Sequence, residues 1–309
     1  MTDTAENIVS EIDKTEEKFG KKFAKWHDKY YKILLLIPVI LLILSLGYLG
    51  YSYQTTGDFI KKDISLTGGT SITIFSSEIN IENLKNYLSQ KTEDYVIKEL
   101  SDFRTGNQKA VIIESKIDSN ELKSYLEEFL GYELTNEKAS IESTGSALGE
   151  SFYTQLRIAI LVSFILMAII VFVLFRVLAP SAAVVISAFA DIIMTLAFID
   201  VLGIKVSSAG ITALLMLIGY SVDTDIMLTT RLLKRHEDTN EKLLSAFKTG
   251  LTMTLTSIIA LAVALFITQS FSDVLKQIFT VLLVGLGFDI LNTWITNVSI
   301  LKWYLGREK

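Results

Sequence analysis

The sequence predicts a polytopic α-helical membrane protein with six transmembrane helices and one extracytoplasmic α+β domain of ferredoxin-like type. Half of its 309 residues are apolar and its mean hydropathy is +0.43, which is typical of a chain that lies mostly in a membrane. Six apolar runs are long enough to cross roughly 30 Å of hydrocarbon at about 1.5 Å per residue. Only one connection between them is long, and it mixes strand-like with helix-like segments.

The apolar runs divide the chain into five parts. These are an amphipathic cytoplasmic lead at 1–32, the first transmembrane helix at 33–53, the extracytoplasmic domain at 54–155, the other five helices within 156–303 and a cytoplasmic tail at 304–309. The five later helices are expected at 156–175, 181–202, 206–230, 251–268 and 278–303. In the lead, apolar residues at helical spacing alternate with lysines, which favours a helix on the anionic membrane surface; a solvated, partly disordered lead is the alternative.

Basic residues predict the orientation of the helices. Five lysines precede the first helix between positions 21 and 32, and Arg176, Arg231 and Lys302 follow the second, fourth and sixth helices. The short loops at the opposite ends hold only two lysines. Because cytoplasmic loops carry an excess of Lys and Arg, we expect both termini in the cytoplasm and residues 54–155 outside a prokaryotic cytoplasmic membrane.

The long connection has the pattern βαββαβ. Residues 65–75, 95–100, 109–114 and 139–142 alternate or are rich in β-branched side chains, whereas 81–89 and 121–130 have helical spacing. Ser119 or Asn120 is expected to cap the second helix, with Gly131 at its end. This order is that of a ferredoxin-like domain.

Composition and motifs exclude several classes of function. The chain has a net charge of −5, so a nucleic-acid partner is not expected. It contains no cysteine, so thiol chemistry, disulfides and cysteine metal sites are excluded. Nucleotide-binding, zinc-protease and serine-hydrolase motifs do not occur. The sequence therefore predicts neither an enzyme nor a cofactor or metal site.

Four acids inside the apolar runs are the main functional candidates: Asp191, Asp223, Asp225 and Asp289. A carboxylate at the centre of a membrane helix costs about 2.5–3.5 kcal/mol on insertion scales. Such groups usually face a bundle interior, where they serve a proton, an ion or a partner charge, and Lys248 is the candidate counter-charge. The alternative is a polar plug that only orders helix packing.

Only one acid of the fourth helix can face the interior, because residues two apart point about 200° apart. Gly219 lies one turn before Asp223 and would let a neighbour approach, so we expect Asp223 rather than Asp225 to face inward. Polar faces on the fifth and sixth helices could line a path for an ion, with ordinary interhelical hydrogen bonding as the alternative. The residues are Thr249, Thr252, Thr256 and Asn292.

Three stretches resemble the SecF family. The segment DISLTGGT contains Asp63, Gly68 and Gly69 and resembles the family pattern G-[IV]-D-F-x-G-G-T. The segment STGSALG, which ends at Gly149, resembles the joint before the second helix. The segment GYSVDTD, which starts at Gly219 and is followed by Arg231, resembles a motif of the fourth helix.

Two departures from the bacterial pattern resemble an archaeal-type SecF. Thr224 stands where the bacterial acid is expected, with an aspartate on each side, and Lys248 replaces an arginine. The resemblance implies an accessory subunit that acts with SecD and the Sec translocon, using the proton gradient to promote export of unfolded polypeptide. Two alternatives stay open: a free-standing RND-like transporter of lipids or small molecules, and a structural subunit that only braces a translocon.

Overall fold

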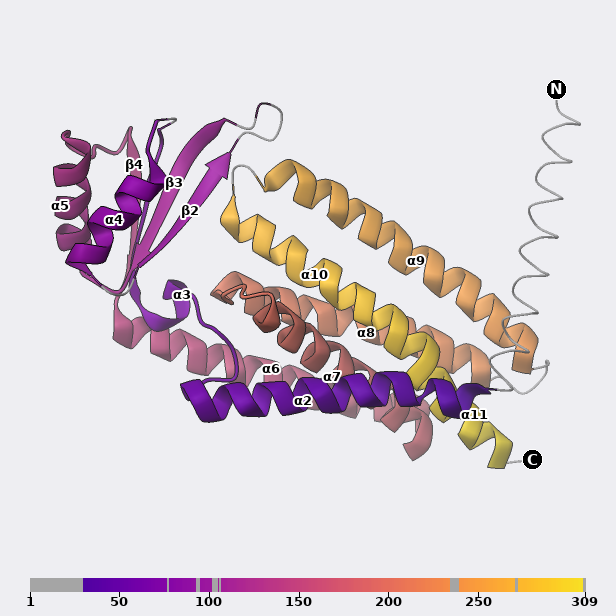
Figure 1. Ribbon diagram of the computed structural model, residues 1–309. Helices are drawn as coiled ribbons and strands as arrows, with labels where there is room; N and C mark the ends of the chain where they lie inside the picture. Colours follow the sequence, from indigo (N-terminus) through magenta and orange to yellow (C-terminus); the bar gives the residue numbers. More distant parts are fainter. Residues whose placement is uncertain are drawn as a thin grey trace, which may run out of the picture.

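The computed structural model describes residues 30–307, apart from 77, 93–94, 102–104, 106, 234–238 and 270–271. Nearly all of the amphipathic lead expected at 1–32 lies outside these described residues. Figure 1 shows two bodies: a bundle of long helices, and a smaller domain of strands and short helices at one end of it. We call the two ends of the bundle the domain end and the far end.

Within the described residues, six helices are long and apolar enough to cross a membrane, which confirms the predicted number. They include α2 (Leu36–Thr56), α6 (Ser146–Phe175), α7 (Leu178–Val201), α8 (Ser208–Leu233) and α9 (Thr239–Thr268), and the sixth span joins α10 (Asp273–Leu291), η1 (Asn292–Asn297) and α11 (Val298–Arg307). The α6 and α9 helices begin about three turns before the expected positions 156 and 251, because their first turns are polar and lie outside the apolar runs.

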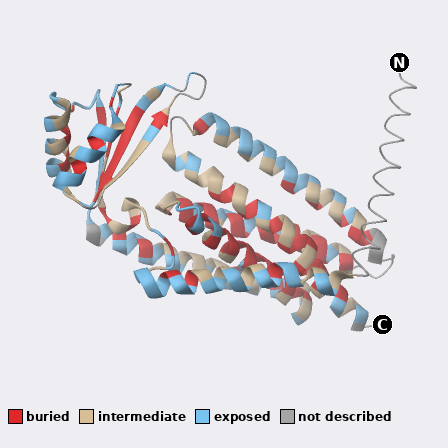
Figure 2. Ribbon diagram, in the orientation of Figure 1, coloured by how far each residue is buried: buried red, intermediate tan, exposed pale blue. Residues whose placement is uncertain are grey.

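Burial differs sharply between the helices. Figure 2 shows that α7 and α8 are the most buried, whereas α9 is largely exposed along its length. The exposed side chains of α2 and α6 are mainly Leu, Ile, Val and Phe. These helices therefore offer a surface suited to lipid, and α7 and α8 form the centre of the bundle with α10.

The domain between α2 and α6 contains the predicted βαββαβ unit. Its elements are β1 (Gly69–Ile74), α4 (Ile81–Lys91), β2 (Tyr95–Ser101), β3 (Gln108–Ser115), α5 (Ser119–Leu130) and β4 (Ala139–Thr144). The sheet is antiparallel with the order β2-β3-β1-β4, as in a ferredoxin-like fold. Leu84, Leu88, Leu122 and Leu126 of the helices are fully buried against Ile72, Ile74, Val111 and Ile113 of the sheet.

Two local predictions in this domain are wrong. The expected strand at 65–75 begins only at Gly69, because Asp63 accepts a hydrogen bond from the Ile64 amide and caps the short helix α3 (Ile64–Thr67). Asp118, and not Ser119 or Asn120, caps α5. Gly131 does end α5, in a left-handed conformation with φ +74°.

The domain is joined to the bundle by backbone contacts. The Val206 amide donates to the Lys61 carbonyl at 2.7 Å, and the Asp63 amide donates to the Val206 carbonyl at 3.0 Å. Nearby, a Cβ added to Gly149 would lie 2.5 Å from the Gly68 amide nitrogen. Gly68, which follows α3, and Gly149, in the first turn of α6, therefore meet closely at this junction.

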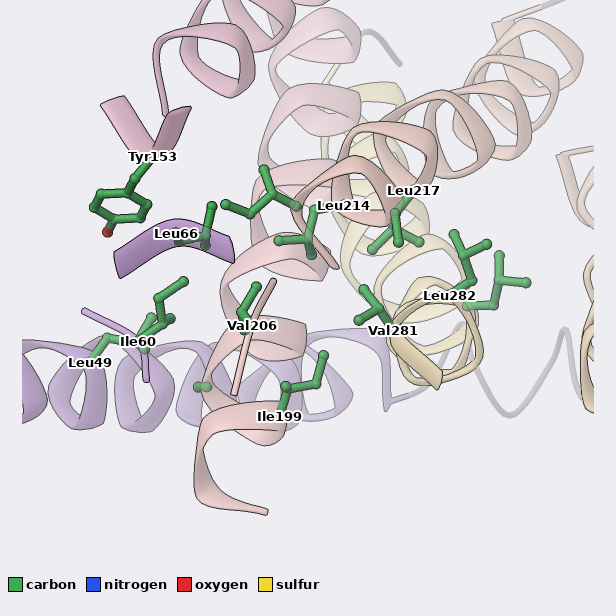
Figure 3. Close-up of a cluster of buried hydrophobic side chains, with 14 residues drawn as sticks. Leu49, Ile60, Leu66, Tyr153, Ile199, Val206, Leu214, Leu217, Val281 and Leu282 are labelled. Carbon is green, nitrogen blue, oxygen red and sulfur yellow. The ribbon is translucent and has the colours of Figure 1, made fainter. Parts of the chain in front are cut away.

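Apolar side chains fill the same junction. Ile60 and Leu66 come from the segment after α2, and they pack with Tyr153 of α6 and Leu214 of α8 (Figure 3). Gly69 is a second constrained position, because it has φ +141° and an added Cβ would lie 2.5 Å from the Ser115 carbonyl oxygen. This part of the junction therefore depends on close backbone packing.

Candidate functional site

Three aspartates from three helices meet at the centre of the bundle. Asp191 of α7 and Asp225 of α8 have no exposed surface, and Asp289 of α10 is 1% exposed. They are close enough for their charges to interact. With their neighbours they form what we call the polar layer: Ser187, Asp191, Ser221, Asp225, Asp289, Asn292, Thr293 and Asn297.

Hydrogen bonds orient each carboxyl group in the polar layer. Asp191 accepts from the Ser221 hydroxyl at 2.5 Å and from the Asn292 amide at 2.7 Å. Asp225 accepts from the Asn297 amide at 2.8 Å, and the Thr293 hydroxyl lies 3.1 Å from Asp289. Asp191 and Asp225 are therefore both bound to the sixth span, so a shift of that span would alter the surroundings of both.

A π-helical segment positions the amides of the sixth span. The η1 segment runs from Asn292 to Asn297 between α10 and α11. In an α-helix, residues five apart point about 140° apart, but the i to i+5 repeat of a π-helix brings them towards one side. Asn292 and Asn297 thus reach Asp191 and Asp225 respectively, although they are five residues apart.

Apolar side chains close the polar layer on both sides along the bundle. Towards the domain end lie Leu214, Leu217, Val281, Leu282 and Leu286. Leu217 packs directly on Gly285, where an added Cβ would meet it at 2.4 Å. Towards the far end lie Leu228, Leu232, Trp294, Val298 and Leu301. The three carboxyl groups are therefore occluded from both ends.

The polar layer has more acceptors than its protein neighbours satisfy. Buried oxygen atoms without a hydrogen-bond partner include Oδ2 of Asp225, Oδ2 of Asp289 and Oδ1 of Asn297. Among the described residues, no lysine or arginine forms an ion pair with the three aspartates, and no three acidic or histidine side chains form a metal-type cluster. Buried carboxylates without a cation are costly, so protons or a mobile cation must neutralise part of this charge.

The prediction that Asp223 faces inward is wrong. Asp223 is exposed on the outer face of α8, whereas Asp225 is buried. Gly219 was the misleading signal, because nothing lies within 4 Å of a Cβ added there. The better signal is Ser221, which is one turn before Asp225 and shares its buried face with Leu214, Leu217, Leu228 and Leu232.

The other predicted polar residues divide in a similar way. Asn292 lies in the polar layer as expected, but the threonines of α9 do not. Thr252 and Thr256 are exposed and bond to carbonyls of their own helix, and Lys248 is also exposed. Thr249 accepts from Arg231, which also binds Ser245 and so ties α8 to α9. The sequence analysis did not identify Ser221, Thr293 or Asn297, because their partners depend on the rotation of α8 and on the π segment.

The fold and the polar layer together define a class of protein. It is a multi-pass membrane protein whose central helices hold occluded carboxyl groups and whose bundle is fixed to a folded domain at one end. The family model of the protein export membrane protein SecD/SecF, C-terminal, matches residues 125–307.

Curated relatives give the family more narrowly. A protein-export membrane protein SecF from Methanolacinia petrolearia is 39% identical over 279 residues, which is 89% of this chain and 94% of that protein. The SecF of Methanocaldococcus jannaschii is 40% identical over 284 residues, which is 90% of this chain and 96% of that protein. The chain belongs to the SecF family of protein-export membrane proteins, and its archaeal relatives confirm the resemblance in the sequence.

A solved structure supports the fold. The crystal structure of SecDF, a translocon-associated membrane protein from Thermus thermophilus, matches with a TM-score of 0.70 at 22% identity. The match covers 90% of this chain but only 38% of that one. The chain therefore corresponds to well under half of the SecDF chain.

Proposed function

We propose that this chain is a SecF-type accessory subunit of the protein-export machinery, in which proton exchange at the polar layer biases the pose of the domain. The single observation that carries the proposal is the occluded layer of three aspartates with unpartnered oxygens and no paired cation. Adding or removing one proton there changes the charge of a buried site, and such a change is strong enough to favour another helix arrangement.

Neutralising the central acid tests this proposal. Asp225→Asn keeps the shape of the side chain but can no longer exchange a proton. In cells that depend on this chain, we expect the variant to insert normally, to lose most export of a secreted reporter, and to lose the response of export to dissipation of the proton gradient. Export by Asp225→Asn at the level of the unsubstituted protein would refute the proposal and would favour a bracing subunit.

The outer face of α8 supports SecD as the partner. A stripe of that helix is exposed although it contains polar groups: Thr212, Met216, Gly219, Tyr220, Asp223 and Thr230. A lipid-facing carboxylate at Asp223 would cost about 2.5–3.5 kcal/mol on insertion scales, so a protein partner is a better neighbour than lipid. In the SecDF relative, the greater part of the chain lies outside the match and could supply such a partner.

Co-purification in mild detergent tests this interface. Asp223→Asn should weaken recovery of SecD and leave the polar layer unchanged. Asp225→Asn is the matched control, because it lies two residues away on the buried face and should co-purify normally. Equal recovery of SecD with both variants would count against the α8 face. Because the curated relatives share the SecF name, a free-standing lipid or small-molecule transporter is not favoured.

The proposed orientation places the domain outside the cell and both termini in the cytoplasm. Its support is the asymmetry of Lys and Arg in the short loops. Since the chain contains no cysteine, single-cysteine variants give a clean test. A membrane-impermeant thiol reagent added outside should label Asn136→Cys in the domain and spare Gly306→Cys at the far end, and the opposite pattern would reverse the orientation.

A further inference from the structure

The domain contacts the bundle in a third place, which differs from the two backbone contacts described above. Lys98 of β2 lies 2.5 Å from Glu114 of β3 and 3.7 Å from Asp273 at the start of α10. This contact consists only of charged side chains. It can therefore open and close without breaking the backbone hydrogen bonds that hold the domain to Val206.

The charged contact is incompletely paired. One carboxylate oxygen of Glu114 and one of Asp273 are buried without a hydrogen-bond partner. A cavity of about 270 Å³ borders Glu114 and is lined by Lys61, Lys116 and Lys205, among others. Asp63 and Lys205 also act electrostatically on Glu114. The 3.7 Å between Lys98 and Asp273 is too long for a direct hydrogen bond, so the two groups can separate at low cost.

The other end of α10 lies in the polar layer. Asp273 is the first residue of α10 and Asp289 is sixteen residues later in the same unbroken helix, about 24 Å along its axis. The next residues, in η1, bind Asp191 and Asp225 through Asn292 and Asn297. The helix α10 thus contacts the domain at its first residue and carries one buried acid near its other end, and η1, which continues it, binds the other two. Figure 1 shows the start of α10 near β2 and β3.

We propose that Lys98 and Asp273 are positioning residues through which α10 transmits changes in the polar layer to the domain. This inference rests on the proposed function, because it assigns the route from the buried acids to the domain. A shift or rotation of α10 moves Asp273 relative to Lys98, and the ion pair makes the domain follow. Without the pair, α10 moves but the domain stays in the pose that the backbone contacts set.

The distance between spin labels on the domain and the bundle tests this route. The labels can be placed at Asn136→Cys in the domain and at Leu202→Cys, at the end of α7 nearest the domain. Both positions are exposed, and the chain has no cysteine of its own. We expect Asp225→Asn to shift the distribution of label distances in the otherwise unsubstituted chain. The shift should be clearly reduced in a Lys98→Gln or an Asp273→Asn background, because loss of a partly exposed ion pair changes a two-state population by roughly two- to fivefold.

Matched variants separate coupling from damage to the fold. Lys91→Gln removes the Lys91–Glu128 pair within the domain and should leave the response to Asp225→Asn intact. Asp273→Glu keeps the charge and should retain the response, and Asp273→Asn lies outside the domain and so cannot unfold its core. The combined Lys98→Gln and Asp273→Asn variant should be no worse than either alone.

The outcomes also separate this inference from the proposed function. If Asp225→Asn stops export and still shifts the labels fully in the Asp273→Asn background, the route through Lys98 and Asp273 is wrong and the proposed function stands. If Asp225→Asn exports normally, the proposed function is wrong. If Asp273→Asn and Lys98→Gln each lower export whereas Asp273→Glu and Lys91→Gln do not, the route is supported.

Discussion

Buried acids occur at two levels of this molecule, and their surroundings are opposite. At the domain junction, Asp200 accepts from the Tyr48 hydroxyl at 2.8 Å and from the Lys61 amide at 2.7 Å, and Glu114 is paired with Lys98. In the polar layer, Asp225 and Asp289 each keep an oxygen without a partner and no lysine or arginine of the described chain pairs with them. Fixed donors hold Asp200 and a lysine pairs with Glu114, although one Glu114 oxygen also lacks a hydrogen-bond partner. None of the polar-layer acids pairs with a described lysine or arginine.

The difference in partners between the two groups of buried acids indicates which acids to associate with transport. A buried carboxylate whose oxygens are bonded to fixed donors contributes to structure, and its removal leaves those donors unsatisfied. A buried carboxylate without a cation costs free energy in the folded state, so its presence needs another reason. Asp225 and Asp289 fit the second description, and Asp200 fits the first. Asp191 has features of both, because its two oxygens are bonded but no described lysine or arginine pairs with it.

The largest expected effect concerns the rigid part of the junction. Gly149→Ala adds a methyl group 2.5 Å from the backbone nitrogen of Gly68, where no side chain can move aside. We expect the variant to lose about 3 kcal/mol or more of unfolding free energy, at the upper end of overpacking costs. Thermal unfolding in detergent measures it.

Gly50→Ala is the matched control for that variant. Gly50 is also helical, and nothing lies within 4 Å of a Cβ added there. This substitution should be neutral or stabilise by about 0.5–1 kcal/mol, as alanine does in helices. Equal unfolding temperatures for the two variants would show that the contact between Gly68 and Gly149 is not rigid.

A smaller effect is expected when the stability of two variants is compared, each lacking one buried acid, one at the junction and one in the polar layer. Asp200→Asn keeps only one acceptor oxygen for two donors and should lose about 1–3 kcal/mol of stability. Asp289→Asn removes a carboxylate whose second oxygen has no partner, so its stability should change by less than about 1 kcal/mol while export is lost. Unfolding midpoints and export of a reporter, measured together, should therefore rank the two variants in opposite orders.

The smallest effect is the pH dependence contributed by Glu114. Burial raises the pKa of this carboxyl group above its ordinary 4.5, and the nearby Asp63 raises it further, although Lys98 opposes both. Because the folded state binds this proton more tightly than the unfolded state, Glu114 contributes stability as pH falls from neutral towards about 4.5 and loses it as pH rises through the raised pKa. Glu114→Gln should flatten the dependence of the unfolding midpoint on pH over that range, and an unchanged slope would contradict this assignment.

Periodicity and composition were sufficient to predict the main architecture. The six apolar runs and the βαββαβ order depend on local patterns of two and 3.6 residues, which tertiary contacts reinforce here. The short helix α3 was missed because one side chain, Asp63, decides it by capping Ile64 in an otherwise strand-like stretch.

The candidate site was only partly predictable. Asp191, Asp289 and Asn292 follow from the rule that polar groups in membrane helices face the interior. The choice between Asp223 and Asp225 depends on the rotation of α8 against α7 and α10, and an apolar run with acids on opposite faces leaves that rotation open. The partners Thr293 and Asn297 could not be assigned either, because an α-helical period places them differently from the π segment that the chain adopts.

The π segment also sets how far α11 is rotated about its axis relative to α10. A π turn holds one more residue than an α turn would, so deleting a single residue between Asn292 and Asn297 would let α10 and α11 merge into one regular helix. Every side chain beyond the deletion would then swing by about 100° around the axis. Asn297 would leave Asp225 while Asn292 stayed on Asp191, so the extra residue is what lets a single span reach both acids.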